Sequence, residues 1–221
     1  VDINSGVDSD SGQLIGPYVK ANLTLALAHW KQSHFLHPAA GVMGKVRLID
    51  IGVPVKACED QNIQVHQSED KDIKSYFQER DPNSHKGSYG HVLVLAGSKG
   101  KGGAAGLTAL AVLRAGAGLC TLALPNSSQK AFEVHPMEVM TVPLPETTSG
   151  TLSLKAKESI LDLLEGKSVV AIGPGISTDA ETVALIGELL PFIKCPLVLD
   201  ADALNAISHY DNWLKELPLE T

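Results

Sequence analysis

Short apolar runs alternate with longer stretches of helical periodicity through most of this chain. From Ser68 onward, the apolar runs are too short for helices and are bounded by turn residues, so we expect strands there. The expected strands cover residues 92–96, 119–124, 139–142, 169–172 and 197–200. The expected helices between them cover residues 104–115, 127–134, 154–165 and 179–192. This alternation is typical of an α/β fold, with a mostly parallel sheet and helices on both faces.

The stretch from His85 to Leu119 carries the strongest functional signal. Its apolar run 92–96 predicts a central strand that is buried on both faces. The loop that follows is dense in glycine, with Gly97, Gly100, Gly102 and Gly103. Backbone N–H groups without a neighbouring Cβ can close on a phosphate or a ring edge, at the positive end of the next helix. That helix is apolar on every face, so we expect it to be buried until Arg114 and the glycines at 116 and 118 end it.

The spacing of this loop departs from three common nucleotide-binding loops. A Walker A loop needs Ser or Thr after Gly-Lys, but Gly102 follows Gly100-Lys101. A dinucleotide-binding Rossmann loop needs an acidic residue at the end of the next strand, where Pro125-Asn126 stands. A kinase-type glycine loop lies in a hairpin, whereas a helix follows here. The alternative to an anion site is that the glycines only allow close packing of helix on strand.

Further residues follow the later strands. Gly173-Pro174-Gly175 comes after the fourth expected strand, and Asp200, Asp202 and Asn205 come after the fifth. Ligands of open α/β sheets bind beyond the carboxyl ends of the strands, so we expect these residues to meet the glycine loop there. Gly-Pro-Gly gives a rigid turn that a flat ring can approach, or it is an ordinary turn. For Asp202 we favour a helix cap over a catalytic role.

The first 55 residues alternate loop and apolar strand, with one expected strand at 23–27. Asp2 lies just before Ser5-Gly6, so a carboxylate and a hydroxyl can converge on an ion or a ribose hydroxyl, unless they only form a turn. Residues 56–67 are polar and without periodicity, which indicates a linker. Ser68 is then expected to cap a short helix that ends near Phe77. We therefore divide the chain into 1–55, the linker 56–67, and 68–221.

Composition excludes some classes of partner. The chain has 18 Lys plus Arg against 25 Asp plus Glu, and a net charge of −7 argues against nucleic acid and anionic membranes. No apolar run approaches the length of a membrane span. Three widely spaced cysteines indicate reduced thiols, so we expect a cytoplasmic protein, although a chain that begins with Val1 says nothing about targeting. For His85 and His135 we favour structural roles.

Six motifs, in order, resemble the ADP-dependent NAD(P)H-hydrate dehydratase family, whose fold is ribokinase-like. They are HKG at 85–87, LAGS at 95–98, GGAAGLTALAVLRAGAGL ending at Leu119, HPMEVM at 135–140, IGPG at 172–175 and LDADALN at 199–205. Each motif is weak alone, but the ordered set is specific and covers the chain from about Ser68 to Asn205. A ribokinase-like small-molecule kinase and a non-catalytic nucleotide- or protein-binding fragment remain the alternatives.

The first segment is similar to the closing third of the NAD(P)H-hydrate epimerase domain, which bacteria and archaea commonly fuse ahead of the dehydratase. The similarity rests on VDINSGVDSDSGQLIG at 1–16 and GKVRLIDIGVP at 44–54. The family motif Asp-Ile-Pro-Ser-Gly has Asn4 at the proline position here, a change that we expect to loosen the turn. Asp2 and Ser5 match the positions that contact the substrate and a potassium ion.

The resemblance implies a repair enzyme for hydrated NADH and NADPH. The epimerase part would interconvert the R and S hydrates, and the dehydratase part would remove the hydroxyl of the S hydrate with ADP. The implied substrate contacts are Asp2, Ala104, Gly173, Gly175 and Asn205, with Ser5 on potassium. ADP is the implied cofactor, with ATP and magnesium as further candidates, and we expect a homo-oligomer. The family's catalytic aspartate, in Gly-x-Gly-Asp, is expected beyond Thr221, so residues 1–221 alone should be inactive as a dehydratase.

Overall fold

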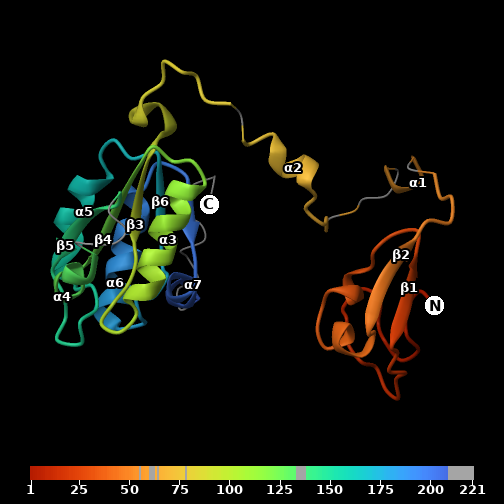
Figure 1. Cartoon of the computed structure of the whole chain (residues 1–221). Helices are drawn as coiled ribbons and strands as arrows, with labels where there is room; N and C mark the ends of the chain where they lie inside the picture. The colour runs from red at the N-terminus through yellow and green to blue at the C-terminus, as the bar shows by residue number, and fades with distance from the viewer. Residues whose placement is uncertain (55, 60–62, 64, 78, 133–137, 209–221) are drawn as a thin grey trace. The chain divides into compact units, whose positions relative to one another are not determined.

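The computed structural model describes residues 1–54, 56–59, 63, 65–77, 79–132 and 138–208 (Figure 1). It contains two compact units, Val1–Glu79 and Arg80–Thr221. The expected linker is not devoid of structure, because the four-residue helix α1 spans Lys56–Glu59 within it. The short helix expected after Ser68 is α2, Asp70–Lys74, and Glu69 rather than Ser68 is its N-cap.

The larger unit is built on a parallel sheet of five strands in the order β5-β4-β3-β6-β7. The strands are β3 (His91–Leu95), β4 (Leu119–Pro125), β5 (Met140–Leu144), β6 (Val169–Ile172) and β7 (Leu197–Leu199). The predicted fold class and all five predicted strands are confirmed. The chain runs outward from β3 through β4 to β5 and then returns to the other side of β3 for β6 and β7. The order of strands therefore reverses between β3 and β6, which is the topological switch point of the sheet.

Helices follow the strands as the periodicity predicts. They are α3 (Gly102–Arg114), α4 (Asn126–Gln129), α5 (Lys157–Leu164), α6 (Ala180–Leu189) and α7 (Asp202–Ile207). Short 3-10 turns precede α5 at Leu154–Ala156 and extend α4 and α6 at Lys130–Phe132 and Leu190–Phe192. Residues 133–134 of the expected helix 127–134 lie outside the described residues. Both faces of β3 are covered: Leu93 and Leu95 pack into one apolar cluster, and Val94 packs into another with α3 residues. The sheet is thus the centre of a three-layer unit.

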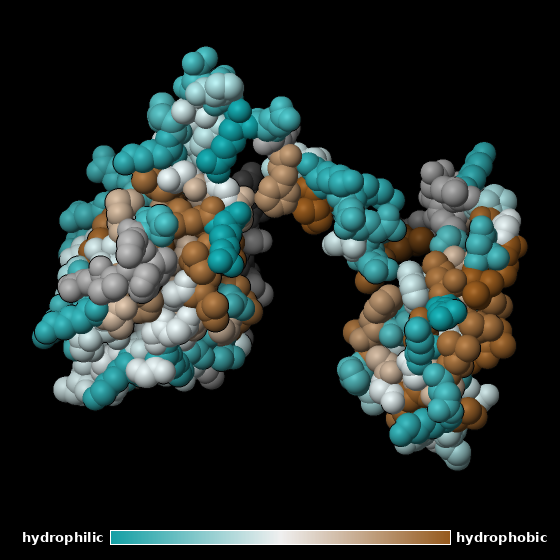
Figure 2. Space-filling model, viewed as in Figure 1, coloured by the Kyte–Doolittle hydropathy of each residue, from teal (hydrophilic) through white to brown (hydrophobic). Residues whose placement is uncertain are grey.

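One prediction about α3 is wrong. We expected a fully buried helix, but only Ala105 and Ala109 of α3 are buried, and Leu107 is 72% exposed. Figure 2 shows hydrophobic surface over this helix. Helix α3 packs on the sheet with one side only. A helix that is apolar all round shows that burial would be tolerated on every side, but not that a partner covers every side.

The smaller unit contains two parallel strands, β1 (Leu23–Leu27) and β2 (Lys45–Ile49), beside two short 3-10 turns at Gln32–His34 and Ala39–Val42. Its small core is formed by Val7, Ala39, Val42 and Met43. Several apolar side chains of the strands and of the segment after them stay exposed, and Figure 2 shows them as a hydrophobic surface on this unit. They are Leu23, Leu48, Ile49, Ile51 and Val53. Among the described residues of both units, no helix combines the length and apolar character needed to cross a bilayer.

We expected Asn4 to loosen its turn, but its side chain is buried and hydrogen-bonded. Its side chain is 7% exposed, and its amide nitrogen donates to the carbonyls of Val19 at 2.9 Å and Val42 at 3.0 Å. Its amide oxygen accepts from the Thr24 hydroxyl at 3.0 Å. Three segments that are distant in sequence are therefore tied to one side chain, and proline at this position would lack all three hydrogen bonds.

Candidate functional site

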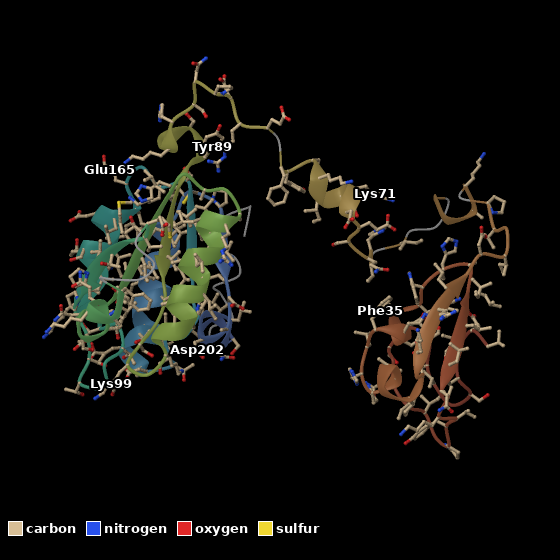
Figure 3. The ribbon with its side chains drawn as sticks, viewed as in Figure 1. Phe35, Lys71, Tyr89, Lys99, Glu165 and Asp202 are labelled. Atoms are coloured by element: carbon tan, nitrogen blue, oxygen red, sulfur yellow. The ribbon has the colours of Figure 1, made fainter. Side chains whose placement is uncertain are left out.

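The loops after β3 and β6 meet at the switch point of the sheet. Gly97 donates its N–H to the carbonyl of Pro174 at 2.8 Å, and the Ser98 hydroxyl donates to the carbonyl of Gly175 at 2.7 Å. Figure 3 shows Lys99 and Asp202 at this end of the larger unit, with Tyr89 and Glu165 at the opposite end. The predicted meeting of the glycine loop with Gly-Pro-Gly is confirmed. In an open α/β sheet this crevice is where a ligand is bound.

The glycine loop combines close packing with free donors. Gly97 has a φ of +82°, and a Cβ there would lie 3.0 Å from the Cβ of Ala105, so this glycine serves the packing of α3 on the sheet. By contrast, the N–H groups of Gly100, Gly102 and Gly103 donate to no acceptor among the described residues. These groups lie at the start of the 13-residue helix α3, where the helix dipole is positive. The two interpretations of the glycines therefore apply to different members of the loop.

Ala104 and Gly175 lie close together where these loops meet. A Cβ on Gly175 would lie 3.2 Å from the Cβ of Ala104 and 3.0 Å from the carbonyl oxygen of Lys101. Gly175 also has a φ of +71°, a conformation that a residue with a side chain adopts only with strain. A larger side chain at Gly175 would therefore meet Lys101 and Ala104. The structure thus brings together the two positions that the family resemblance assigned to the nicotinamide ring.

Gly173 serves a different purpose. Its φ is +131°, and a Cβ there would lie 1.8 Å from the carbonyl oxygen of Asp200 and 2.7 Å from the Cβ of Ala203. The absence of a side chain at Gly173 therefore allows the loop after β6 to lie against the loop after β7. Its assignment as a substrate contact stays a prediction.

We favoured a helix cap for Asp202, but the N-cap of α7 is Ala201, and the Asp202 side chain caps no backbone N–H of this helix. Asp202 is the first residue of α7, and its Oδ2 accepts the N–H of Ser177 at 2.9 Å and contacts the Lys101 ammonium at 3.2 Å. Asn205, a predicted substrate contact, is exposed and lies 3.4 Å from the other carboxylate oxygen. Partial burial would raise the pKa of Asp202, but the hydrogen bonds from Ser177 and Lys101 outweigh it, so the pKa lies below its usual 3.8. Asp202 thus ties the loops after β3, β6 and β7 together.

A cavity of about 390 Å³ lies on the other side of the glycine loop, against the carboxyl ends of β4 and β5. Lys99 and Gly100 line it together with Ser127, Phe132 and Glu146. Glu146 was missed by the sequence analysis. Its only sequence signal is its place two residues after the end of β5, where the carboxyl edge of a parallel sheet puts functional side chains.

In the smaller unit, Asp2 is held by groups that follow β1. Its Oδ1 accepts the N–H of Leu27 at 2.9 Å and an ion pair from Lys31, while its carbonyl lies 3.0 Å from Nε2 of His34. Burial would raise the pKa of Asp2, but the hydrogen bonds from Lys31 and Leu27 outweigh it and lower the pKa. Ser5 is exposed, and no hydrogen bond joins it to Asp2. Lys31 is a neighbour that the sequence did not indicate.

Other candidate residues have structural surroundings. Nδ1 of His85 accepts the N–H of Gly87 at 3.1 Å and caps a 3-10 turn at Lys86–Tyr89, whereas His135 lies outside the described residues. Cys120 and Cys195 are free thiols, and burial raises the pKa of Cys120 to about 11, so this thiol is unreactive. Within the described ranges, no three His, Cys, Asp or Glu side chains are grouped as a metal site would require.

The sequence profile of the NAD(P)H-hydrate dehydratase family matches residues 92–218, more than half of the chain. This chain belongs to that family. The match contains the switch-point crevice, the cavity beside it and every strand of the larger unit except the first residue of β3. A family profile of a dehydratase, rather than of a small-molecule kinase, favours the first of the functions that the sequence left open.

Curated relatives of this dehydratase-family chain are longer. The bifunctional NAD(P)H-hydrate repair enzyme Nnr of Moorella thermoacetica is 41% identical over 208 residues, which are 94% of this chain and 39% of that protein. The enzyme of the same name from Thermofilum pendens is 33% identical over 98% of this chain and 40% of its own length. The chain therefore spans about 40% of the length of these relatives.

A solved structure supports the ribokinase-like fold. The ADP/ATP-dependent NAD(P)H-hydrate dehydratase of Bacillus subtilis, co-crystallised with ATP and Mg²⁺, is 29% identical, with a TM-score of 0.50. The similarity covers 61% of this chain and 45% of that one.

Proposed function

We propose that the larger unit is the substrate-binding part of an ADP-dependent NAD(P)H-hydrate dehydratase. The observation that carries the proposal is the approach of Ala104 to Gly175 at the switch point, beside free N–H groups of the glycine loop. A flat ring would lie against the surface formed by these two positions, because Gly175 has no side chain and Ala104 has only a methyl group. The hydrate differs from NADH or NADPH by water added across a ring double bond, so the reaction removes a hydroxyl and a proton and restores that bond.

The residues of this chain would bind and orient the substrate. Ala104 and Gly175 would hold the hydrated ring, and the N–H groups of Gly100, Gly102 and Gly103 would face negative charge. The proton would be taken by an aspartate in a Gly-x-Gly-Asp motif, which residues 1–221 do not contain. The catalytic step therefore needs residues other than those of this chain.

ADP or ATP would supply a phosphate that makes the hydroxyl a better leaving group. Magnesium would then be held mainly by the phosphates, because it keeps several waters and uses only one or two carboxylates.

For the smaller unit we propose a part of an NAD(P)H-hydrate epimerase site. The Asp2 carboxylate is ionised at neutral pH and is held by Leu27 and Lys31, so it is positioned to orient a polar substrate group. The Ser5 hydroxyl is exposed and has no partner in the described part of the chain, so it can serve a potassium ion. The proposed enzyme acts in the cytoplasm as a homo-oligomer.

The dehydratase proposal is tested by Ala104→Leu in the full-length protein. The larger side chain should fill the crevice and abolish turnover of the S hydrate, measured as loss of hydrate absorbance with ADP. Ala104 is only half-buried, so the thermal midpoint should stay within a few degrees of wild type. Ala111→Leu, on the exposed side of the same helix, is the matched control and should remain active. Normal turnover by Ala104→Leu would contradict the placement of the ring.

The epimerase proposal is tested by Asp2→Asn and Ser5→Ala in the full-length protein. Asp2→Asn should reduce epimerisation by at least about a hundred-fold, while ADP-dependent dehydration of the S hydrate continues. Ser5→Ala should act more mildly, and added potassium should restore part of its rate. If both variants epimerise normally, or if dehydration falls in step, the segment has only a structural role.

A further inference from the structure

The cavity beside the glycine loop has properties that the ring crevice does not explain. It lies over β4 and β5, whereas the crevice lies between β3 and β6. Its walls differ in chemistry: a carboxylate and hydroxyls come from Glu146, Ser127 and Ser128, and an apolar wall comes from Ala131 and Phe132. The volume of about 390 Å³ suits one part of a nucleotide rather than a whole dinucleotide.

Glu146 is a fixed carboxylate with one oxygen free. Its Oε2 accepts both the N–H of Ser127 at 2.9 Å and the Ser127 hydroxyl at 2.8 Å. Its Oε1 accepts a hydrogen bond from no described residue, and no cation pairs with Glu146 among them. A carboxylate in this state accepts well from the hydroxyls of a ligand, because the hydrogen bond is charge-assisted and the side chain is already ordered.

The backbone that carries Glu146 is also fixed. Glu146 pairs with Leu152 in an antiparallel bridge, and Thr147 donates its N–H to the carbonyl of Thr151 at 2.8 Å. This hairpin is joined to the glycine loop, because the N–H of Lys99 donates to the carbonyl of Gly150 at 2.9 Å. This hydrogen bond ties the hairpin that carries Glu146 to the glycine loop.

A cation and backbone amides line the same cavity as the carboxylate. Lys99 lines the cavity, and none of the ion pairs of the described residues includes it. Gly100 and Gly102 line it too, and their N–H groups donate to none of the residues that the structure describes. Glu146 thus accepts hydrogen bonds from hydroxyls, while Lys99 and the glycine loop attract negative charge. A sugar phosphate carries both kinds of group.

We propose that this cavity is a ribose-phosphate subsite, in which Glu146 accepts the hydrogen bonds of the two vicinal ribose hydroxyls and the glycine loop holds the phosphate. That this ribose belongs to the hydrated dinucleotide rests on the proposed function. The apolar wall of Ala131 and Phe132 lies along the non-polar face of the sugar. Glu146 is then a specificity-determining residue for the ribose, separate from Ala104 and Gly175, which hold the ring.

The test uses the full-length protein with its nucleotide site saturated by ADP. Ribose 5-phosphate and 2-deoxyribose 5-phosphate are compared by ligand-observed nuclear magnetic resonance, since the second sugar lacks one of the two hydroxyls. Wild type should bind ribose 5-phosphate about ten-fold more tightly, the effect of one charge-assisted hydrogen bond. Glu146→Gln should remove this preference and weaken the binding of NADH by a similar factor. Glu158→Gln, an exposed carboxylate of α5, is the matched control and should keep the preference.

Ser128→Ala serves as a second variant, because it removes a cavity hydroxyl without touching the bond between Glu146 and Ser127. It should weaken ribose 5-phosphate by a few-fold with an unchanged thermal midpoint. Equal binding of the two sugar phosphates by wild type, or an unchanged preference in Glu146→Gln, overturns the subsite. If wild type prefers ribose 5-phosphate but does not dehydrate the hydrate, the proposed reaction is wrong and the subsite stands. If wild type dehydrates the hydrate without any sugar preference, only the subsite is wrong.

Discussion

Buried polar residues carry much of the organisation of this chain, and Asn4 is the plainest case. Its three hydrogen bonds join it to Val19, Thr24 and Val42. The residues next to Asn4 in the sequence do not indicate these bonds. A relative with proline in this turn must satisfy those buried groups in another way. A polar residue at a motif position can therefore have a structural role that differs from the role of the residue it replaces.

Asn4→Ala should destabilise the smaller unit by about 1–3 kcal/mol, because the Val19 carbonyl loses its side-chain donor and a buried amide is removed. The Val42 carbonyl keeps the N–H of Ala21, and the Thr24 hydroxyl keeps the carbonyl of Met43. Hydrogen exchange of the β1 amides measures this local loss, and those amides should exchange faster. Asn22→Ala, which removes an exposed amide just before β1, is the control and should leave the exchange unchanged. Equal exchange in Asn4→Ala and wild type would mean that the buried amide contributes nothing.

Asp202 gives a prediction about pH. Its folded pKa is lowered, so its stabilisation is present above the unfolded value near 3.8 and is lost as pH falls through the folded pKa. Asp202→Asn should therefore be less stable than wild type by about 1 kcal/mol at pH 7, since the ion pair with half-exposed Lys101 adds little to the bond from Ser177. The difference should shrink below about pH 4. Chemical denaturation at a series of pH values measures it, with the exposed Asp200→Asn as the control. A difference that stays constant down to pH 2 would show that charge is not involved.

At the level of strands, helices and turns, the glycines of the larger unit have two separate tasks. Gly97 and Gly173 let neighbouring elements approach, whereas Gly100, Gly102 and Gly103 leave backbone donors open. Sequence spacing alone does not separate the tasks, because both require the absence of Cβ. The structure separates the two tasks, because it shows which atoms a Cβ at each glycine would meet.

Gly173→Ala should therefore disrupt the packing of the β6 loop on the β7 loop. A Cβ would lie 1.8 Å from the carbonyl oxygen of Asp200, so the loss should exceed about 3 kcal/mol in urea unfolding. Gly166→Ala has a positive φ of +67° but no atom within 4 Å of the added Cβ, and it should cost only about 1 kcal/mol. Similar losses for the two variants would assign the effect to backbone conformation rather than to contact.

For the molecule as a whole, the main question is which groups of the proposed dehydratase site lie within residues 1–221. The larger unit carries the proposed ring crevice and ribose subsite, while the family's catalytic aspartate motif is absent from residues 1–221. Loss of a general base typically lowers the rate by about two to four orders of magnitude. We therefore expect residues 1–221 alone to turn over the S hydrate at least about a hundred-fold more slowly than an intact relative. The assay follows hydrate absorbance with ADP, and a rate near that of the relative would place the base within this chain.

The smaller unit supports the same view of the whole molecule. It consists of two parallel strands with exposed apolar side chains, whereas parallel strands are normally covered on both faces. Leu23 and Ile49 are exposed on these strands. This surface agrees with the proposed membership of a larger epimerase domain.

Local pattern determined much of what could be predicted. The five strands of the larger unit and the glycine loop were placed correctly, because strand length, apolar runs and glycine conformation depend on neighbouring residues. The convergence of Gly97 with Gly175 also followed, since parallel strands end at a common edge. The rest required tertiary structure. The exposed side of α3, the tie made by Asp202, the hydrogen bonds of Asn4 and the cavity at Glu146 all depend on which distant residues become neighbours, and no local periodicity records that.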